Sequence, residues 1–578
     1  MAGVGAALWL LGLFAAAPAL RTAQRYDFTD RLRDALILGV AIPFALGFVH
    51  ALYAAACWIA LAACIASAYA RGFFPERESR PARAPYVLVV ALAAVAWPQL
   101  IRPLLEGDSL SYHLPNAAAW VQSHSVWTTA TRYWWYPPAS ELFASGLYAT
   151  SGPFALAWSG FGALTLLGFR IYAWTRESGA SPLLGDTLAA ATVAAYPLAI
   201  QAGTLQNDVW LAAFWIESLW RLRGSGDAGA AQRTVAVSAL IKPQGWILTA
   251  IALLARRAGV RPWAAAGVAF GLWVLHDALL WRGSIVAPST TLYAGDFGST
   301  ILGHGFPAIA LLLRVAAVVA PFALVAILAA AGGPWLARRD RALGWAACAA
   351  ALLVLVIPFG YATAVAQLAT GASLRFAAPA IAAGAAILSS ASQRFTRLAT
   401  VFFAACTAVG IWQIGATFWN DAPTRTALGV AALAVLSIWC ARRPLGRWTA
   451  IAGFAAAVVA SQALAQRHTV DFFTDAFRVH GRASGIYAWL ASNRPPAVGG
   501  WGLALGTVNV LAPGARTVEL PESDACAAAR QQRVMLVAVA QDDRSAAFNA
   551  ARLKAARSCG PVSFDDGLAV AARPQVAR

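Results

Sequence analysis

Apolar runs separated by short polar loops recur along almost the whole chain. Each run is close to twenty residues long, and an α-helix of that length crosses the roughly 30 Å hydrocarbon core of a bilayer. Because lipid offers no partner to backbone polar groups, such runs are expected to be helices. We predict about fourteen spans, at residues 5–20, 33–50, 52–70, 84–101, 152–174, 185–202, 207–221, 262–281, 306–330, 343–367, 374–391, 396–416, 424–441 and 447–466. The pattern predicts an all-α polytopic membrane protein.

Composition and charge sharpen this prediction. The 578-residue chain is 60% hydrophobic and only 12% charged, against roughly 25% charged residues in an average soluble domain. Its formal net charge of +18 is carried by arginines that cluster in alternate loops, as expected for the cytoplasmic loops of a membrane protein. Nucleic acid is therefore not needed as a partner. The same rule places the loop 102–152 and the tail after Arg467 on the outer side.

One segment departs from the regular pattern. Residues 233–256 are long enough for one span, but they carry arginines at both ends, so a single crossing would put one cluster on the wrong side. Pro243 and Gly245 divide the segment into halves of about eleven residues, each roughly 16 Å long as a helix. We predict a re-entrant hairpin with Lys242 at its tip. Irregular backbone at that depth is tolerated only where it lines a cavity.

The tail has the alternation of a small α/β domain. We expect two helices, at Ile486 to Leu490 and at Ser545 to Arg557, and two strands, at Thr507 to Leu511 and at Val534 to Ala540. The tail has no glycine-rich nucleotide loop ahead of a helix, so it is interpreted as an accessory or acceptor-facing module.

Two of the seven cysteines, Cys526 and Cys559, lie in this tail. An oxidising compartment would permit a disulfide between them, and two free thiols remain the alternative. The other cysteines fall within or beside apolar runs, where cysteine usually serves as a small hydrophobic residue. No cysteine spacing indicates a metal site.

Two acidic residues are predicted at the outer face of the membrane. Asp108 follows the fourth apolar run, and Asp208 lies in the next external turn. An ionisable group at the membrane needs a partner and by default indicates function. The alternative for both is a helix-capping aspartate. His113 follows shortly after Asp108. The alternative to a functional role for His113 is a packed, hydrogen-bonded histidine.

Two cations face the same side in the predicted topology. Lys242, at the hairpin tip, is expected either to bind a phosphate or to pair with a buried carboxylate or reach towards water. Arg375 begins a span from the outer side, where arginine breaks the local charge rule. It is expected either to anchor the helix at the interface or to clamp an anionic head group.

Taken in order, these motifs resemble those of the GT-C membrane glycosyltransferases, particularly the branch with protein mannosyltransferases and the lipid A aminoarabinose transferase. The resemblance covers roughly Tyr86 to Gln393. It rests on Asp108, the stretch with Tyr136, Pro137, Pro138 and Glu141, then Asp208, Lys242, Arg375, Phe376 and Pro379. The chain departs from the pattern in having one acid in the second motif and three added runs before Tyr86.

The resemblance implies a GT-C-like all-α fold with a small C-terminal α/β extramembrane domain, in a bacterial inner membrane. Four parts are expected: additional transmembrane helices at 1–83, a catalytic core at 84–393 with the long external loop 102–152, further transmembrane helices at 394–466, and a periplasmic α/β domain at 467–578.

The resemblance also implies transfer of a sugar from a polyprenyl-phosphate-linked donor to an envelope acceptor that the sequence does not identify. Asp108 and Asp208 are the expected catalytic residues. Asp108 would accept the acceptor's proton, and Asp208 would orient Lys242 or bind a sugar hydroxyl. Expected to bind substrate are Lys242, Arg375, His113, Tyr136, Glu141 and Glu106. The resemblance implies no definite cofactor, and a divalent cation is left open.

Two other functions fit a polytopic chain with charged residues at the membrane. One is a transporter or flippase of lipid-linked sugars, although the sequence shows no convincing internal repeat of the kind transporters commonly have. The other is a non-catalytic protein of envelope glycan assembly built on the same scaffold.

Overall fold

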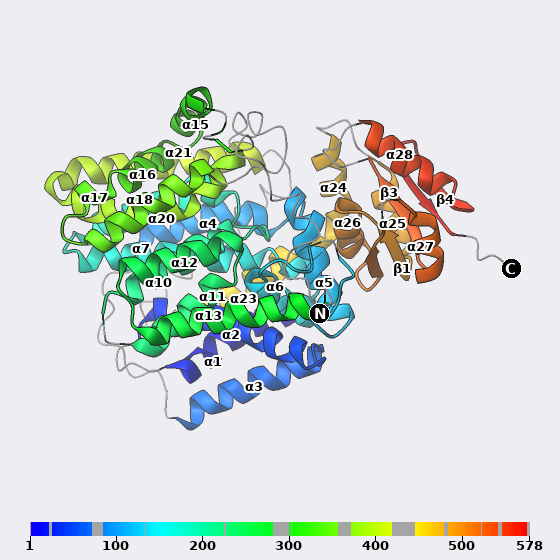
Figure 1. Cartoon of the computed structure of the whole chain (residues 1–578), viewed down its shortest axis with the longest axis horizontal. Coiled ribbons are helices and arrows are strands. Elements are labelled where there is room, and N and C mark those ends of the chain that lie inside the picture. The colour runs from blue at the N-terminus through cyan, green and yellow to red at the C-terminus, as the bar shows by residue number, and fades with distance from the viewer. Residues whose placement is uncertain are drawn as a thin grey trace.

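The structure is a computed structural model, shown in Figure 1. It describes residues 2–21, 26–71, 85–131, 133–224, 227–280, 300–301, 303, 305–356, 372–418, 446–478, 484–521, 523–540 and 546–574. The predicted span 424–441 and Cys440 lie outside the described residues. Helices form one large body, and a smaller domain with a β-sheet lies beside it at the C-terminal end of the chain (Figure 1).

The body is built from α-helices of very different lengths. They are α1 (Ala2–Ala16), α2 (Phe28–Phe48), α3 (Ala54–Ala70), α4 (Tyr86–Leu100), α5 (Leu114–Gln122), α6 (Ala139–Ser151), α7 (Trp158–Glu177), α8 (Pro182–Ala194), α9 (Tyr196–Ala199), α10 (Asp208–Arg221), α11 (Ala228–Ala239), α12 (Pro243–Ala255), α13 (Val260–Leu280), α15 (Gly305–Val319), α16 (Pro321–Ala331), α17 (Gly333–Leu336), α18 (Arg341–Val356), α20 (Ala378–Ala391), α21 (Thr396–Phe418), α23 (Gly446–Arg467) and α24 (Thr469–Arg478). Short turns of 3-10 or π-helix join several of them, and two of these, η2 (Ser109–His113) and η5 (Ala372–Ala377), matter for the site.

Four helical stretches in the described part of the chain are long and apolar enough to cross a membrane by themselves. They are Gly3–Leu20, Pro153–Glu177, Val260–Leu280 and Leu374–Phe418. With these stretches and seven shorter apolar helices, the chain is a multi-pass membrane protein, as predicted.

Several predicted spans are shorter than expected. The predicted span 185–202 is divided into α8 and α9 because the backbone is extended at Ala195, just ahead of the turn that contains Pro197. At about 1.5 Å per residue, the thirteen residues of α8 reach only about 20 Å. Length alone therefore over-predicted this span.

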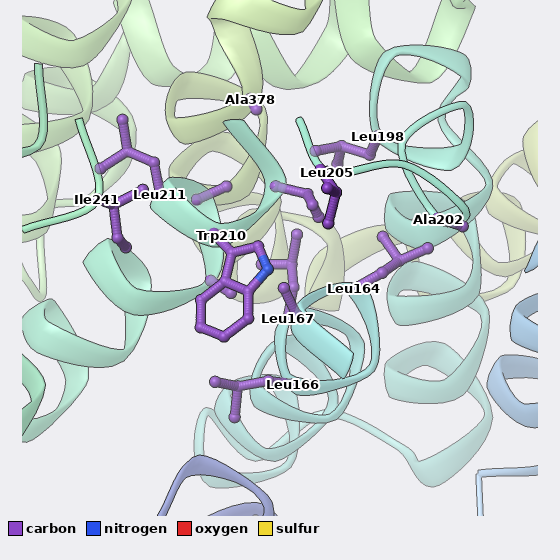
Figure 2. Packing of buried hydrophobic residues seen from close by; sticks show 14 of the residues in the cluster. Leu164, Leu166, Leu167, Leu198, Ala202, Leu205, Trp210, Leu211, Ile241 and Ala378 are labelled. Atoms are coloured by element: carbon purple, nitrogen blue, oxygen red, sulfur yellow. The ribbon is translucent and has the colours of Figure 1, made fainter. Parts of the chain in front are cut away.

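Large apolar side chains from α7, α10 and the turn before α10 fill the centre of the body. Trp210 lies among Leu164, Leu167 and Leu205 (Figure 2), and its indole N–H donates to the Ser159 hydroxyl at 3.1 Å.

The chain before α10 passes very close to α7. A Cβ on Gly160 of α7 would lie 2.2 Å from the carbonyl oxygen of Gln201, so only glycine permits this approach. The packing thus fixes the segment that leads to Asp208.

A network of buried ions ties the N-terminal helices to the body. Glu217 of α10 accepts from Arg33 of α2 at 3.3 Å, from Arg170 of α7, and from Arg221 of its own helix at 2.8 Å. Asp30 and Asp34 of α2 balance these three arginines. The three charged groups Arg33, Arg170 and Glu217 are almost wholly buried, so the helices before residue 86 are integral to the packing of the body.

The C-terminal domain is a five-stranded sheet with helices, which confirms the predicted α/β class. Its elements are α25 (Ile486–Asn493), β1 (Ala497–Gly500), α26 (Leu503–Leu511), β2 (Arg516–Glu519), α27 (Ala525–Gln532), β3 (Met535–Val539), α28 (Ala546–Arg557), β4 (Val562–Asp565) and β5 (Ala569–Ala572). The strand order is β2-β1-β3-β5-β4. β1 runs parallel to β2 and β3, whereas β5 is antiparallel to β3 and β4.

One predicted strand of this domain is wrong. Residues Thr507 to Leu511 belong to helix α26, and even the polar Thr507 and Asn509 in it are fully buried. A helix covered on every side lacks the polar stripe that reveals a period of 3.6 residues, so its β-branched residues suggested a strand. The other predicted strand is β3, and the two predicted helices are α25 and α28.

Cys526 and Cys559 form a disulfide in this domain, with their Cα atoms 5.3 Å apart. The bond joins the start of α27 to the segment that follows α28. Closing a loop of this length contributes on the order of 3 to 4 kcal/mol in the chain-entropy model. The alternative of two free thiols is excluded.

Candidate active site

The segment 233–256 consists of two short helices, α11 and α12, joined at Leu240 to Lys242, as predicted for the hairpin. Two hydrogen bonds hold the junction. The backbone N–H of Ala139 donates to the carbonyl of Leu240 at 2.9 Å, and the side-chain amide of Asn207 donates to the carbonyl of Ile241 at 3.2 Å. The starts of α6 and α10 therefore position Lys242.

Lys242 and Asp208 form a buried ion pair. The Lys242 ammonium donates to Asp208 Oδ1 at 2.5 Å, and both side chains are about 6% exposed. Asp208 is the first residue of α10, but it makes no side-chain capping bond. The side chain of Gln201 accepts from the N–H of Val209 instead, at 3.0 Å. The capping interpretation of Asp208 is therefore wrong, because another residue takes that part.

Asp108 is likewise not a cap. The Glu106 carboxylate accepts from the backbone N–H groups of Asp108 and Ser109 and from the Ser109 hydroxyl, each at 2.8 Å. The same hydroxyl accepts from the N–H of Leu205 at 3.0 Å. Glu106 thus caps η2 and leaves the Asp108 carboxylate to other partners, while Ser109 ties this segment to the one that leads to Asp208.

Arg375 joins the two acidic segments. It lies in η5, just before α20, and its guanidinium donates to Asp108 Oδ2. The same guanidinium lies 3.8 Å from Asp208 Oδ2 and 3.8 Å from Glu106 Oε1. Four segments that are far apart in the sequence therefore bring Asp108, Asp208, Lys242 and Arg375 together in one site. Arg375 is not a simple interfacial anchor.

The carboxyl groups of Glu106 and Asp108 titrate differently although they are neighbours. Burial raises the pKa of Glu106 above its ordinary value, and the negative charge of Asp108 adds to this effect. Burial also acts to raise the pKa of Asp108, but the positive charges of Arg375 and His113 outweigh it and hold that pKa below its ordinary value. Asp108 is therefore a carboxylate throughout the neutral range.

His113 and Glu141 form a second buried pair beside this cluster. His113 Nδ1 lies 2.6 Å from Glu141 Oε1, and the Ser140 hydroxyl donates to Glu141 Oε2 at 2.8 Å. The ring of His113 contacts that of Tyr112 with centroids 4.0 Å apart, and Tyr112 in turn lies 5.9 Å from Tyr136. The three candidates His113, Glu141 and Tyr136 thus form a wall of paired and aromatic side chains next to Asp108.

A pocket lies beside the Lys242–Asp208 pair. Its lining comes from α10, the junction before α12, α12, α18, η5 and the start of α20, and consists of Asp208, Leu211, Lys242, Gln244, Leu248, Ala350, Leu353, Phe376 and Pro379. The Phe376 ring lies 5.2 Å from the Lys242 ammonium and 5.0 Å from the Arg375 guanidinium, within the range of cation–π attraction. Among the described residues, no group of three or more His, Cys, Asp or Glu is arranged to hold a metal ion.

Sequence reasoning missed Gln244 in this pocket. Glutamine carries no charge, so nothing marks it as costly to bury at the membrane. The only signal was its place two residues after Lys242, at the start of α12.

The C-terminal domain covers the segment that carries Asp108. Helix α26 packs against η2 and α5, and Figure 1 shows α26 beside α5. A Cβ on Gly506 of α26 would lie 2.1 Å from the carbonyl oxygen of Leu110, so the helix rests directly on the backbone of η2. At the sheet edge, the Gln122 side chain donates to the carbonyl of Ala515 at 2.8 Å and accepts from the N–H of Thr517 at 3.1 Å.

The fold and the site define a polytopic helical membrane protein with a cluster of acids and cations beneath a C-terminal α/β domain. No family model matches the chain, and no curated protein matches it. The chain is similar to two solved structures of ArnT from Cupriavidus metallidurans. One is bound to undecaprenyl phosphate (TM-score 0.47, 15% identity) and one is in the apo state (TM-score 0.43, 17% identity), and each match covers 85% of this chain and 99% of that chain. At these scores the likeness says nothing of the reaction.

Proposed function

We propose that this protein is a glycosyltransferase of the GT-C type, which moves a sugar from a polyprenyl-phosphate-linked donor to an envelope acceptor at the periplasmic face of the bacterial inner membrane. The observation that carries the proposal is the convergence of Asp108, Asp208, Lys242 and Arg375, from four separate segments, in one site of a membrane protein. A site for sugar transfer from a lipid phosphate needs both a base and cations, and these residues supply both.

The cations suit the departure of the carrier. In the transfer, a bond forms between the acceptor's oxygen or nitrogen and the anomeric carbon, and the bond between that carbon and the phosphate oxygen breaks. Its electron pair leaves with the phosphate, so negative charge develops there. Lys242 and Arg375 would stabilise this charge in a site that is largely shielded from water, where such stabilisation is strongest.

Asp108 is the proposed base for the acceptor's proton. In the structure its carboxylate is held by Arg375, which lowers its basicity. When the phosphate of the lipid-linked sugar accepts the hydrogen bonds that Arg375 otherwise gives to Asp108, it neutralises the positive charge of Arg375. The basicity of Asp108 then rises. Binding of the donor phosphate would thereby activate the base. Asp208 would keep Lys242 charged and oriented.

The C-terminal domain and the wall formed by His113, Glu141 and Tyr136 flank Asp108 and would shape the acceptor side. The acceptor is therefore proposed to approach from the outer side, between the membrane body and the periplasmic domain. Its chemical identity is a hydroxyl or amine of a glycan, lipid or protein.

Replacing Asp108 by Asn tests the proposal. The variant removes the base but keeps the size of the side chain, so we expect turnover to fall by about 100-fold or more while donor binding is retained. The assay measures release of polyprenyl phosphate from a lipid-linked sugar by purified protein in nanodiscs. Asp471→Asn is the matched control, because that side chain is 75% exposed on α24.

Three outcomes would contradict the proposal. Undiminished release of polyprenyl phosphate by Asp108→Asn would remove Asp108 from the chemistry. Movement of lipid-linked sugar across the bilayer by the wild-type protein, with no release of polyprenyl phosphate, would favour a transporter or flippase. Donor binding without either activity would favour a non-catalytic assembly protein.

A further inference from the structure

Gln244 lies at the second position of α12, two residues after Lys242. Its side chain lines the same pocket as Asp208 and Lys242, and apolar side chains such as Leu248 and Phe376 complete the lining. The pocket therefore presents three polar groups, an ammonium, a carboxylate and an amide, against an otherwise apolar wall.

The ammonium and the carboxylate have a hydrogen-bond partner within the protein, whereas the amide oxygen has none among the described residues. Lys242 and Asp208 satisfy each other at 2.5 Å. Within the described part of the chain, the Gln244 side-chain oxygen is buried and has no hydrogen-bond partner. Buried polar atoms in folded proteins are almost always hydrogen-bonded, so this atom needs a partner from outside the chain, either a water or a ligand group that displaces it.

The chemistry of this atom restricts the ligand. An amide oxygen only accepts, so its partner must carry an O–H or N–H group. The phosphodiester of a lipid-linked sugar is ionised at neutral pH and offers only acceptors, and a prenyl chain offers no polar group. Of the parts of such a donor, only the sugar carries hydroxyl or amino groups.

We propose that Gln244 accepts a hydrogen bond from a hydroxyl or amino group of the donor sugar. This inference rests on the proposed function and assigns separate parts of the donor to separate residues. Lys242 and Arg375 bind the phosphate, whereas Gln244 recognises the sugar. A site with a buried acceptor discriminates strongly against a ligand that lacks the matching donor, because the acceptor then stays unpaired.

The test compares how one variant affects two ligands. Gln244→Leu keeps much of the side-chain volume and removes the acceptor. Binding to purified protein in nanodiscs is measured with farnesyl phosphate alone and with its glucosyl, mannosyl and aminohexosyl phosphodiesters. The control is Gln232→Leu, a half-buried glutamine of α11 that lies outside this pocket.

For the sugar ester that the wild type binds best, we expect Gln244→Leu to weaken binding by about tenfold or more. The affinity for farnesyl phosphate alone should stay within about twofold, and Gln232→Leu should change neither affinity. Equal weakening for both ligands would place Gln244 at the phosphate and overturn the inference. So would unchanged affinity for the sugar ester, or a wild-type protein that binds no sugar ester more tightly than farnesyl phosphate.

Failure of the proposed function gives a different result. A wild-type protein that binds neither farnesyl phosphate nor any ester contradicts the donor class itself, and the inference about Gln244 falls with it. If the wild-type protein binds farnesyl phosphate and its esters, and Gln244→Leu leaves the preference for the sugar ester unchanged, the proposed function stands and only the inference about Gln244 is contradicted.

Discussion

At the scale of single residues, the site depends on which of two neighbouring acids has which partner. Glu106 is occupied with three hydrogen bonds from the start of η2, and Asp108 is left to Arg375. Burial and the negative charge of Asp108 place the pKa of Glu106 above its ordinary value, although its hydrogen bonds act to lower it. The charge of Arg375 outweighs burial at Asp108 and holds that pKa below its ordinary value. As pH falls, Glu106 therefore takes up a proton before Asp108 does.

This order predicts the acid limb of the pH profile. A protonated Glu106 loses acceptor capacity, which loosens the backbone that carries Asp108, so kcat/KM should begin to fall as pH drops through the raised pKa of Glu106. Glu106→Gln removes this titration but, like the protonated acid, offers only one acceptor oxygen. We therefore expect kcat/KM to be lower at every pH and the acid limb to move to lower pH, towards the depressed pKa of Asp108. The measurement is kcat/KM between about pH 4 and pH 8 for both proteins. Superimposable acid limbs would contradict the assignment.

The sequence indicated the members of the site and one of their pairings, Asp208 with Lys242, but not the pairing of Asp108 with Arg375. The positions of Asp108, Asp208, Lys242 and Arg375 in predicted external turns and at a broken helix were enough to select them. Whether Glu106 or Asp108 caps the following turn depends on backbone geometry over two residues, which no pattern of polarity reveals. Gln244 escaped notice because an uncharged amide becomes informative only once its burial is known.

At the scale of elements, the contact between α26 and η2 links the C-terminal domain to the segment of Asp108. The contact depends on Gly506, whose missing side chain lets the helix lie on the carbonyl of Leu110. A helix that is buried on all sides in this way gave no periodic signal, which is why Thr507 to Leu511 was taken for a strand. Strand β3 is also buried along its whole length, but a short, continuous apolar run is typical of a central strand. Helix α28 has both a buried face and an exposed face with Lys554 and Arg557, so its period was visible.

Gly506→Val tests the role of this contact. The added side chain cannot fit against Leu110, so α26 must move away from η2, and the geometry around Asp108 relaxes. We expect kcat to fall by about tenfold or more, with the affinity for donor little changed, because Lys242 and Gln244 lie on the other side of the site. Ala527→Val, at an exposed position of α27, is the matched control. Loss of donor affinity with unchanged kcat would contradict a positioning role.

At the scale of the whole molecule, the buried ion network attaches the N-terminal helices to the rest of the helical body. Glu217 is the shared acceptor for Arg33, Arg170 and Arg221. Removing one member of a buried network leaves uncompensated charge, which costs far more than the loss of an exposed ion pair.

Glu217→Gln should therefore destabilise the protein by about 3 to 5 kcal/mol. Glu177→Gln removes an exposed pair with Arg223, where the two side chains are 55% and 34% exposed, and should change stability by less than about 1 kcal/mol. Thermal unfolding of both variants in the same nanodiscs gives the comparison. Equal melting temperatures would show that the network does not hold the helices together.

The same network constrains how the chain enters the membrane during synthesis. Helix α2 brings Arg33 together with Asp30 and Asp34, so it is neutralised locally from the start. Helix α7 delivers Arg170 about fifty residues ahead of Glu217, its main counter-ion on α10. Until α10 arrives, Arg170 has only Asp30 of α2, at 3.6 Å, as a counter-ion. Because an incompletely paired arginine is expensive at the membrane, α7 gains its full stability only when α10 joins it.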